Sequence, residues 1–168
     1  IVIIGQDPYF NLNEAHGLSF GINNNITKIP PSLKNIAKEL ANDLNCELKD
    51  YSLEHWAKQN ILLLNSALTV EEKKPSSHIK LWSQFTEYIL TTINNDLSNV
   101  IFVAWGAHSH NLCSKIKIDS SKHHLLISSH PSPLSAYKKY KNYPSFLGSK
   151  VFSNINNILK ANNEEIIN

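Results

Sequence analysis

The chain has 168 residues, a length typical of one domain, and a formal net charge of +2 at pH 7. Hydrophobic residues make up 42% and charged residues 18%, which allows a sizeable core and excludes intrinsic disorder as the main state. No apolar run approaches the ~18 residues of a membrane-spanning helix. We therefore expect a single domain over residues 1–168 with no membrane partner. So small a net charge does not by itself identify a polyanionic partner.

Four short apolar or β-branched runs have the character of buried parallel strands, because each is bounded by polar residues or turn formers. They are residues 1–4, 61–64, 100–105 and 125–128. Helical stretches alternate with them at 31–44, 81–97, 107–116 and 150–160. This alternation predicts an α/β layer fold with a mainly parallel sheet.

Polar residues directly follow these predicted strands. Gln6 and Asp7 follow the first strand, Asn65 the second and His130 the fourth. Because the carboxyl ends of parallel strands meet at one edge of a sheet, these side chains can converge on one pocket. A carboxylate held there can stabilise positive charge or orient a water molecule. Taken alone, Asp7 before Pro8 is also typical of a turn, and a single loop histidine is usually a surface residue.

The histidines and cysteines do not fit a metal or disulfide framework. The histidines that follow the third strand and precede the fourth match no common zinc spacing, and no C-x-x-C pair supports them. Cys46 and Cys113 lie far apart, which favours a reducing compartment. The chain has no G-x-S-x-G elbow, no P-loop and no G-x-G-x-x-G motif. We expect neither a metal nor a cofactor.

Five segments carry a more specific signal. They are residues 5–9 (GQDPY), 15–20 (AHGLSF), 30–33 (PPSL), 62–65 (LLLN) and 130–135 (HPSPLS). In order and spacing they resemble the motif set of family 1 uracil-DNA glycosylase, and the resemblance spans nearly the whole chain. It implies a three-layer α/β/α fold with a central four-stranded sheet. It also implies a monofunctional enzyme that flips uracil out of DNA, hydrolyses its N-glycosidic bond and leaves an abasic site, without metal or cofactor.

The resemblance implies two catalytic residues. Asp7 would stabilise the oxocarbenium-like sugar and position the attacking water. His130, in its neutral form, would donate a hydrogen bond to the uracil O2 as negative charge develops on the leaving base.

Four further residues would bind the base. Asn65 would read the O4 and N3 edge, which uracil presents in the reverse sense to cytosine. Phe20 would stack on the flipped base, and Tyr9 would press where thymine carries its methyl group. Gln6 would contact the base through its polar groups.

The same resemblance implies a DNA surface. Leu134 would be the wedge that fills the space left by the extruded nucleotide. Expected contacts to the DNA backbone are Pro30, Pro31, Ser32, Gly106, Ala107, Ser132, Pro133, Tyr137 and Lys138. The expected partners are uracil-containing single- and double-stranded DNA, a proteinaceous glycosylase inhibitor and downstream repair proteins. We expect a monomer, located in the cytoplasm with the nucleoid in a bacterium, or in the nucleus or a mitochondrion in a eukaryote.

The chain departs from the family pattern at several places. Phe10 stands where the family usually has a histidine that helps to hold the water, and Ala107 replaces a hydroxyl residue. Residues 138–145 form a connection about six residues longer than that of the family. Its lysines and tyrosines either extend the DNA footprint or form a solvated surface loop. The family's N-terminal helical part has no counterpart before Ile1.

Two other readings remain open. Phe10 and the truncated start motivate a catalytically weakened uracil-DNA-binding or scaffold module of the same fold. A glycosylase with altered base preference is the third reading, against which Tyr9, Phe20 and Asn65 argue.

Overall fold

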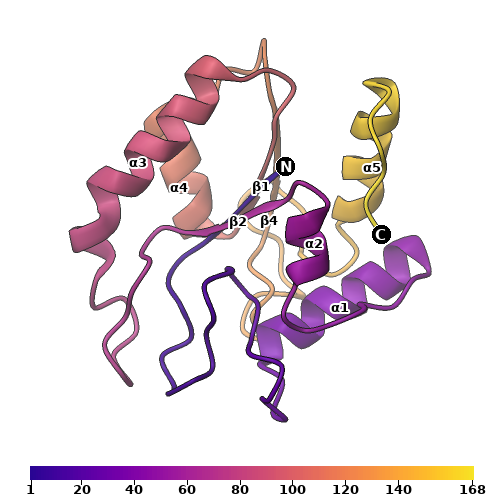
Figure 1. Cartoon of the computed structure of the whole chain (residues 1–168). Coiled ribbons are helices and arrows are strands. Elements are labelled where there is room, and N and C mark those ends of the chain that lie inside the picture. Colours follow the sequence, from indigo (N-terminus) through magenta and orange to yellow (C-terminus); the bar gives the residue numbers. More distant parts are fainter.

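The computed structural model describes all residues from 1 to 168 (Figure 1). The strands are β1 (Val2–Gly5), β2 (Leu62–Asn65), β3 (Ile101–Trp105) and β4 (His124–Ser128). The helices are α1 (Pro31–Leu44), α2 (Glu54–Lys58), α3 (Ile79–Asp96), α4 (Ala107–Ile116) and α5 (Val151–Ala161). None of these helices combines the length and apolar character that crossing a bilayer requires.

The four strands form one sheet in the order β2-β1-β3-β4, and each neighbouring pair is parallel. The predicted α/β fold and its four strands are confirmed, and the mainly parallel sheet is entirely parallel. Because all strands run the same way, their carboxyl ends share one edge. The loops that leave this edge gather below the sheet in Figure 1.

Successive residues of the central strands point to opposite faces of the sheet. Val2 and Ile4 of β1 pack in a cluster with Leu90 of α3 and Cys113 of α4. Ile3 points to the other face, where α1, α2 and α5 cover the larger cluster. The layers are therefore α3 and α4, the sheet, and the other three helices (Figure 1).

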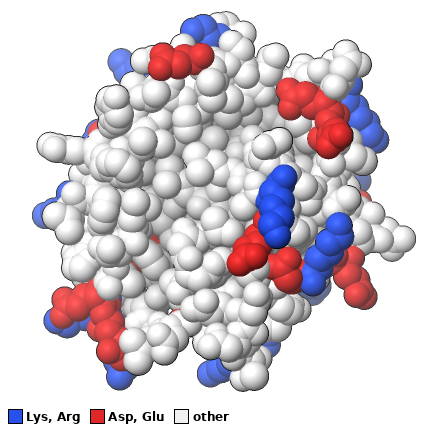
Figure 2. Space-filling model, in the orientation of Figure 1, with Lys and Arg blue, Asp and Glu red and all other residues white.

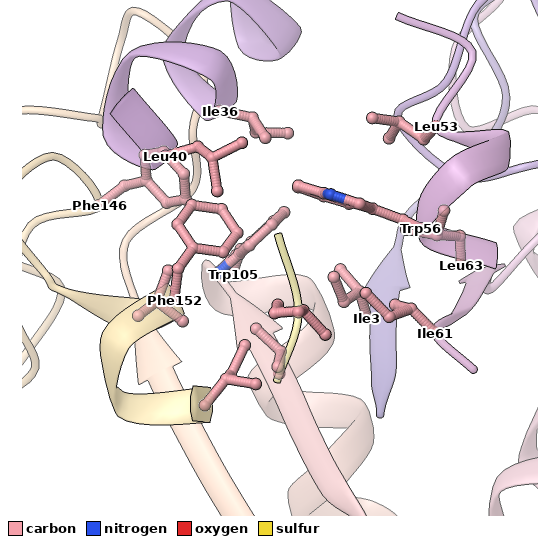
Figure 3. Close-up of a cluster of buried hydrophobic side chains, with 14 of the residues drawn as sticks. Ile3, Ile36, Leu40, Leu53, Trp56, Ile61, Leu63, Trp105, Phe146 and Phe152 are labelled. Carbon is pink, nitrogen blue, oxygen red and sulfur yellow. The ribbon is translucent and has the colours of Figure 1, made fainter. Parts of the chain in front are cut away.

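Aromatic side chains dominate the larger cluster (Figure 3). Trp56 from α2 and Phe152 from α5 lie with their ring centroids 5.5 Å apart, and Trp105 at the end of β3 contacts Phe146 at 5.1 Å. All four side chains are at most 2% exposed. Burial of side chains of this size contributes roughly 1.5–3 kcal/mol each, so this cluster fixes the end of β3 beside the carboxyl edge.

Helix α1 begins and ends where the sequence predicted, at residues 31 and 44. Pro31 and Ser32, which are also expected DNA contacts, are its first two residues, where a proline is well tolerated because its missing N–H would be unpaired. The five-residue helix α2 has no counterpart among the predicted elements, since so short a segment shows no helical period. It follows Leu53, whose φ of 62° turns the chain before the helix.

Candidate active site

A cavity of about 540 Å³ opens at the carboxyl edge of the sheet. The six residues expected to act on the base, from the ends of β1, β2 and β4 and from the loop after β1, all line it. They are Gln6, Asp7, Tyr9, Phe20, Asn65 and His130. The convergence predicted from separate strand ends is therefore present. Of the residues expected to hold the DNA backbone, Ser32 alone also lines the cavity.

The carboxylate of Asp7 is held by the loop that follows β2. The backbone N–H of Ser76 donates to Asp7 Oδ2 at 2.6 Å, and the Gln6 amide nitrogen donates to Oδ1 at 3.3 Å. The same Gln6 nitrogen donates to the Ser76 hydroxyl at 2.8 Å. The Gln6 side chain is thus turned toward Asp7. The role of Ser76 escaped the sequence analysis, because contacts between two loops leave no periodic signal.

Asn65 lies 6% exposed at the end of β2, against Gly5 of the neighbouring strand. A Cβ atom on residue 5 would lie 2.2 Å from Asn65 Oδ1, so a side chain at residue 5 and the present position of the amide exclude each other. No protein group hydrogen-bonds the Asn65 amide, which leaves its carbonyl and its NH₂ group for a molecule in the cavity.

Phe20 and Tyr9 form the aromatic wall. The Tyr9 hydroxyl donates to the Phe20 carbonyl oxygen at 3.0 Å, and burial raises the pKa of that hydroxyl above its ordinary value. Phe20 has a left-handed backbone with φ of 65°, which is uncommon for a bulky residue. Its ring packs edge-on against Trp105 with a centroid distance of 5.3 Å. Backbone strain of this kind concentrates at functional sites.

His130 has a defined tautomer. The backbone N–H of Ser132 donates to His130 Nδ1 at 3.0 Å, so the proton of the neutral ring must lie on Nε2. Burial, with a smaller contribution from His108, lowers the pKa of His130 to about 4. The ring therefore stays uncharged near pH 7. It packs over Gly106, where a Cβ atom would lie 2.8 Å from the His130 Cβ.

Three serine hydroxyls organise the loop that carries His130. Ser135 donates to the His130 carbonyl oxygen at 3.0 Å, and its oxygen lies 3.0 Å from the Ser132 hydroxyl. Ser129 donates to the Ser135 carbonyl oxygen at 2.9 Å. Ser135 was not assigned a role from the sequence, although its spacing of three from Ser132 is the available signal. At the outer turn of this loop, Leu134 is 83% exposed.

Two hydrogen bonds in series, from His108 to Ser66 and from Ser66 to Gln6, support the end of β1. The Ser66 hydroxyl donates to the Gln6 carbonyl oxygen at 2.7 Å, so it accepts a hydrogen bond from His108 Nε2 at 2.6 Å. Burial lowers the pKa of His108, and the charge of Asp7 partly opposes this effect. This pair could not be predicted from the sequence, because His108 stands inside the first turn of α4 with no motif of its own.

On the outer surface around the cavity, two hydrogen bonds join α1 to the loop that carries His130. Asn35 donates to the Pro131 carbonyl oxygen at 2.7 Å, and Lys38 donates to the Tyr137 hydroxyl at 3.3 Å. Gly106 is the N-cap of α4, which begins at Ala107 beside this loop. Pro30, Pro31, Ser132, Pro133, Tyr137 and Lys138 lie outside the cavity lining, so their expected contacts with DNA remain predictions.

Acidic and basic side chains are intermingled on the face seen in Figure 2, with no large field of one sign. Nowhere in the chain do three His, Cys, Asp or Glu side chains gather as metal ligands would. The cavity brings together the Asp7 carboxylate, the neutral His130 imidazole, the amides of Gln6 and Asn65 and an aromatic wall.

Comparison with known proteins places this geometry in a family. The model of the Uracil DNA glycosylase superfamily matches residues 1–160. The chain is 48% identical to a uracil-DNA glycosylase of Psychromonas ingrahamii, over 99% of this chain and 74% of that protein. It is 45% identical to one of Buchnera aphidicola subsp. Baizongia pistaciae, over 100% of this chain and 73% of the relative.

Solved structures give the same result. The crystal structure of mimivirus uracil-DNA glycosylase is similar with a TM-score of 0.90 and 35% identity, covering 99% of this chain and 66% of that one. A variant of mimivirus UNG in complex with UGI matches equally well, with a TM-score of 0.90. The chain therefore spans about three quarters of the curated relatives and about two thirds of the mimivirus chains.

Proposed function

This chain belongs to the uracil-DNA glycosylase superfamily, and on that basis we propose that it excises uracil from DNA by hydrolysing the N-glycosidic bond. The observation that carries the proposal is the convergence of Asp7, Asn65 and His130 on one aromatic-walled cavity. The products are free uracil and an abasic site, and the reaction is the first step of base-excision repair.

Asn65 discriminates the base. Its amide oxygen accepts from the uracil N3–H and its NH₂ group donates to O4, whereas cytosine offers an acceptor and a donor in the opposite arrangement. Phe20 stacks on the flipped base. Tyr9, fixed by its hydrogen bond to the Phe20 carbonyl, excludes the methyl group of thymine.

His130 stabilises the leaving base. Because Nδ1 accepts the Ser132 N–H, Nε2–H is available to donate to the uracil O2. The hydrogen bond from this neutral imidazole strengthens as the uracil O2 becomes negative. The neutral ring also carries no second proton that it could lose to solvent. A preorganised donor of this kind contributes on the order of 3 kcal/mol to transition-state stabilisation.

Asp7 acts on the sugar side. Its carboxylate stabilises positive charge on the sugar as the glycosidic bond breaks, and it orients the water that attacks C1′. The Ser76 N–H and the Gln6 amide fix the two carboxylate oxygens in place. Phe10 has no hydrogen-bonding side chain, so the water is held by Asp7 and backbone groups.

The DNA contacts surround the cavity mouth. Ser32 at the start of α1, with Ser132 and the adjoining prolines, binds phosphates through hydroxyl and backbone N–H groups. Gly106, Ala107, Tyr137 and Lys138 extend this contact. The exposed Leu134 fills the gap in the base stack, which offsets a few kcal/mol of unstacking.

The remaining assignments follow from this function. The protein acts as a monomer on single- and double-stranded DNA, next to the nucleoid of a bacterium such as those of its relatives. An enzyme class that cleaves the DNA backbone at abasic sites must consume its product. A proteinaceous inhibitor of the kind bound to mimivirus UNG would cover the same face, with Leu134 as an apolar anchor.

Uracil release from a single-stranded oligonucleotide in excess EDTA tests the proposal. We expect release by the wild type and its collapse in Asp7→Asn and in His130→Leu. The matched controls are Asp96→Asn and His124→Leu, which change exposed residues away from the cavity. Tight binding of uracil-containing DNA by folded wild type without release would instead establish the binding-module function.

A further inference from the structure

The long connection after the His130 loop is a folded hairpin. Tyr140 and Tyr143 form an antiparallel bridge, with N–H to carbonyl distances of 3.2 and 2.9 Å in the two directions. Lys141 has φ of 52°, as a tight reversal requires. The two tyrosine rings stack with centroids 6.2 Å apart and an interplanar angle of 20°. The segment is therefore ordered by its own contacts.

Helix α4 anchors this hairpin through His110. The His110 ring lies edge-on to both tyrosine rings, at centroid distances of 5.7 and 5.2 Å, and its Nδ1 is 3.2 Å from the Tyr140 hydroxyl. Further along the hairpin, the Ser129 N–H donates to the Pro144 carbonyl oxygen at 3.0 Å. The hairpin is thus tied both to α4 and to the residue before His130.

The base of the hairpin lies next to Leu134. Ala136 accepts a hydrogen bond from the Leu147 N–H at 2.9 Å, which brings the two ends of the segment together two residues beyond Leu134. Tyr137, which directly precedes the segment, is 67% exposed. The hairpin therefore leaves the protein beside the residue that the proposed function inserts into DNA.

The charge of this hairpin is entirely positive. Lys138, Lys139 and Lys141 are exposed, and no Asp or Glu occurs between Asp119 and Glu164. Lys141 Nζ lies 5.3 Å from the centroid of the Tyr140 ring, so the aromatic stack holds one of these charges above it. All sixteen basic residues of the chain are lysines. Lysine binds phosphate as a point charge and lacks the bidentate geometry of arginine. A lysine therefore depends on a rigid support to hold its charge in a fixed place.

We propose that residues 138–143 form a second DNA contact beside Leu134, in which Lys139 and Lys141 bind phosphates of the duplex flanking the extruded nucleotide. This inference rests on the proposed function, because it takes the DNA to be centred on Leu134. The hairpin is already ordered, so binding loses little conformational entropy there. Because the hairpin lies apart from the cavity, we expect it to affect the affinity for duplex DNA.

The test is the salt dependence of binding to a uracil-containing duplex, measured in an Asp7→Asn background that retains the substrate. Lys139→Gln combined with Lys141→Gln removes two positive charges. Each phosphate contact contributes about 0.9 to the slope of log K against log salt, so the slope should decrease by about 1.8. The matched control is Lys122→Gln with Lys160→Gln, which removes two exposed charges elsewhere and should leave the slope unchanged.

Two further measurements make the outcome decisive. His110→Ala keeps every lysine but releases the hairpin from α4, and it should weaken binding while most of the slope remains. An unchanged slope in the double variant, an equal change in the control, or undiminished affinity in His110→Ala would each overturn the inference. Uracil release by the wild type from a trinucleotide too short to reach the hairpin tests the proposed function separately.

Discussion

Gly5 and Asn65 lie side by side on neighbouring strands, so close that a Cβ atom on residue 5 would come within 2.2 Å of the Asn65 amide oxygen. The same atom would also lie 2.9 Å from Ser19 Cβ, so a side chain at residue 5 would clash with two neighbours at once. Gly5 therefore leaves the space that the Asn65 amide needs to point toward the base.

Gly5→Ala should displace that amide and lower uracil release by about 10- to 100-fold, equivalent to about 1.4–2.7 kcal/mol in the barrier. Steady-state kinetics on a uracil-containing oligonucleotide measure the loss, and a chemical denaturation curve separates it from unfolding. Full activity in a folded Gly5→Ala protein would contradict the geometric role given to residue 5.

The low pKa of His130 predicts a pH dependence. Its folded-state pKa of about 4 lies below the ordinary value of about 6.5. The unfolded chain thus takes up a proton at higher pH than the folded one, and stability from this group is present above pH ~6.5 and declines as the pH falls toward 4. A ¹⁵N-resolved NMR titration should find neutral His130 with its proton on Nε2 at pH 6. Protonation near pH 6.5 would exclude this assignment, and the His130→Leu spectrum identifies the signal.

Phe10 offers a gain-of-function test. Its side chain is 39% exposed beside the Asp7 segment, so a polar replacement needs no burial. Phe10→His should raise kcat by about tenfold, because an imidazole can hold the attacking water; this is a modest gain beside the 10²- to 10⁴-fold typical of positioned acid–base groups. Phe10→Leu is the control, since it changes the ring without adding a hydrogen-bonding group. Equal rates in all three proteins would show that the water is already fully held.

Glu39 of α1 predicts a purely structural effect. This 1% exposed carboxylate accepts the backbone N–H groups of Gly148 and Lys150, at 2.7 and 2.9 Å, just before α5 begins. Glu39→Ala should lower the free energy of unfolding by about 1–3 kcal/mol, because it removes a buried carboxylate and leaves two partly buried backbone donors without their acceptor. Glu47→Ala, at an exposed position, should have little effect. Urea denaturation compares the two variants, and equal midpoints would refute the role of Glu39.

The strands could be predicted because each is a short apolar run, and the cavity residues because they follow those runs at one sheet edge. Loop-to-loop contacts could not be predicted. The hydrogen bond from Ser76 to Asp7 joins residues 69 positions apart in two irregular segments, and nothing in either segment indicates the other. The pairing of His110 with Tyr140 could not be predicted for the same reason, although Asn142 between the two tyrosines is a local turn signal.

The left-handed backbone of Phe20 has a consequence for attempts to make this protein more heat-resistant. A non-glycine residue in this conformation costs roughly 1–2 kcal/mol, which a glycine would recover. The ring, however, packs against Trp105 and the core, so a glycine at residue 20 would lose this packing as well as the ring that faces the base. Any thermostabilised version of this fold should be built from changes on its far side, such as the amino ends of the strands, and should leave residue 20 strained.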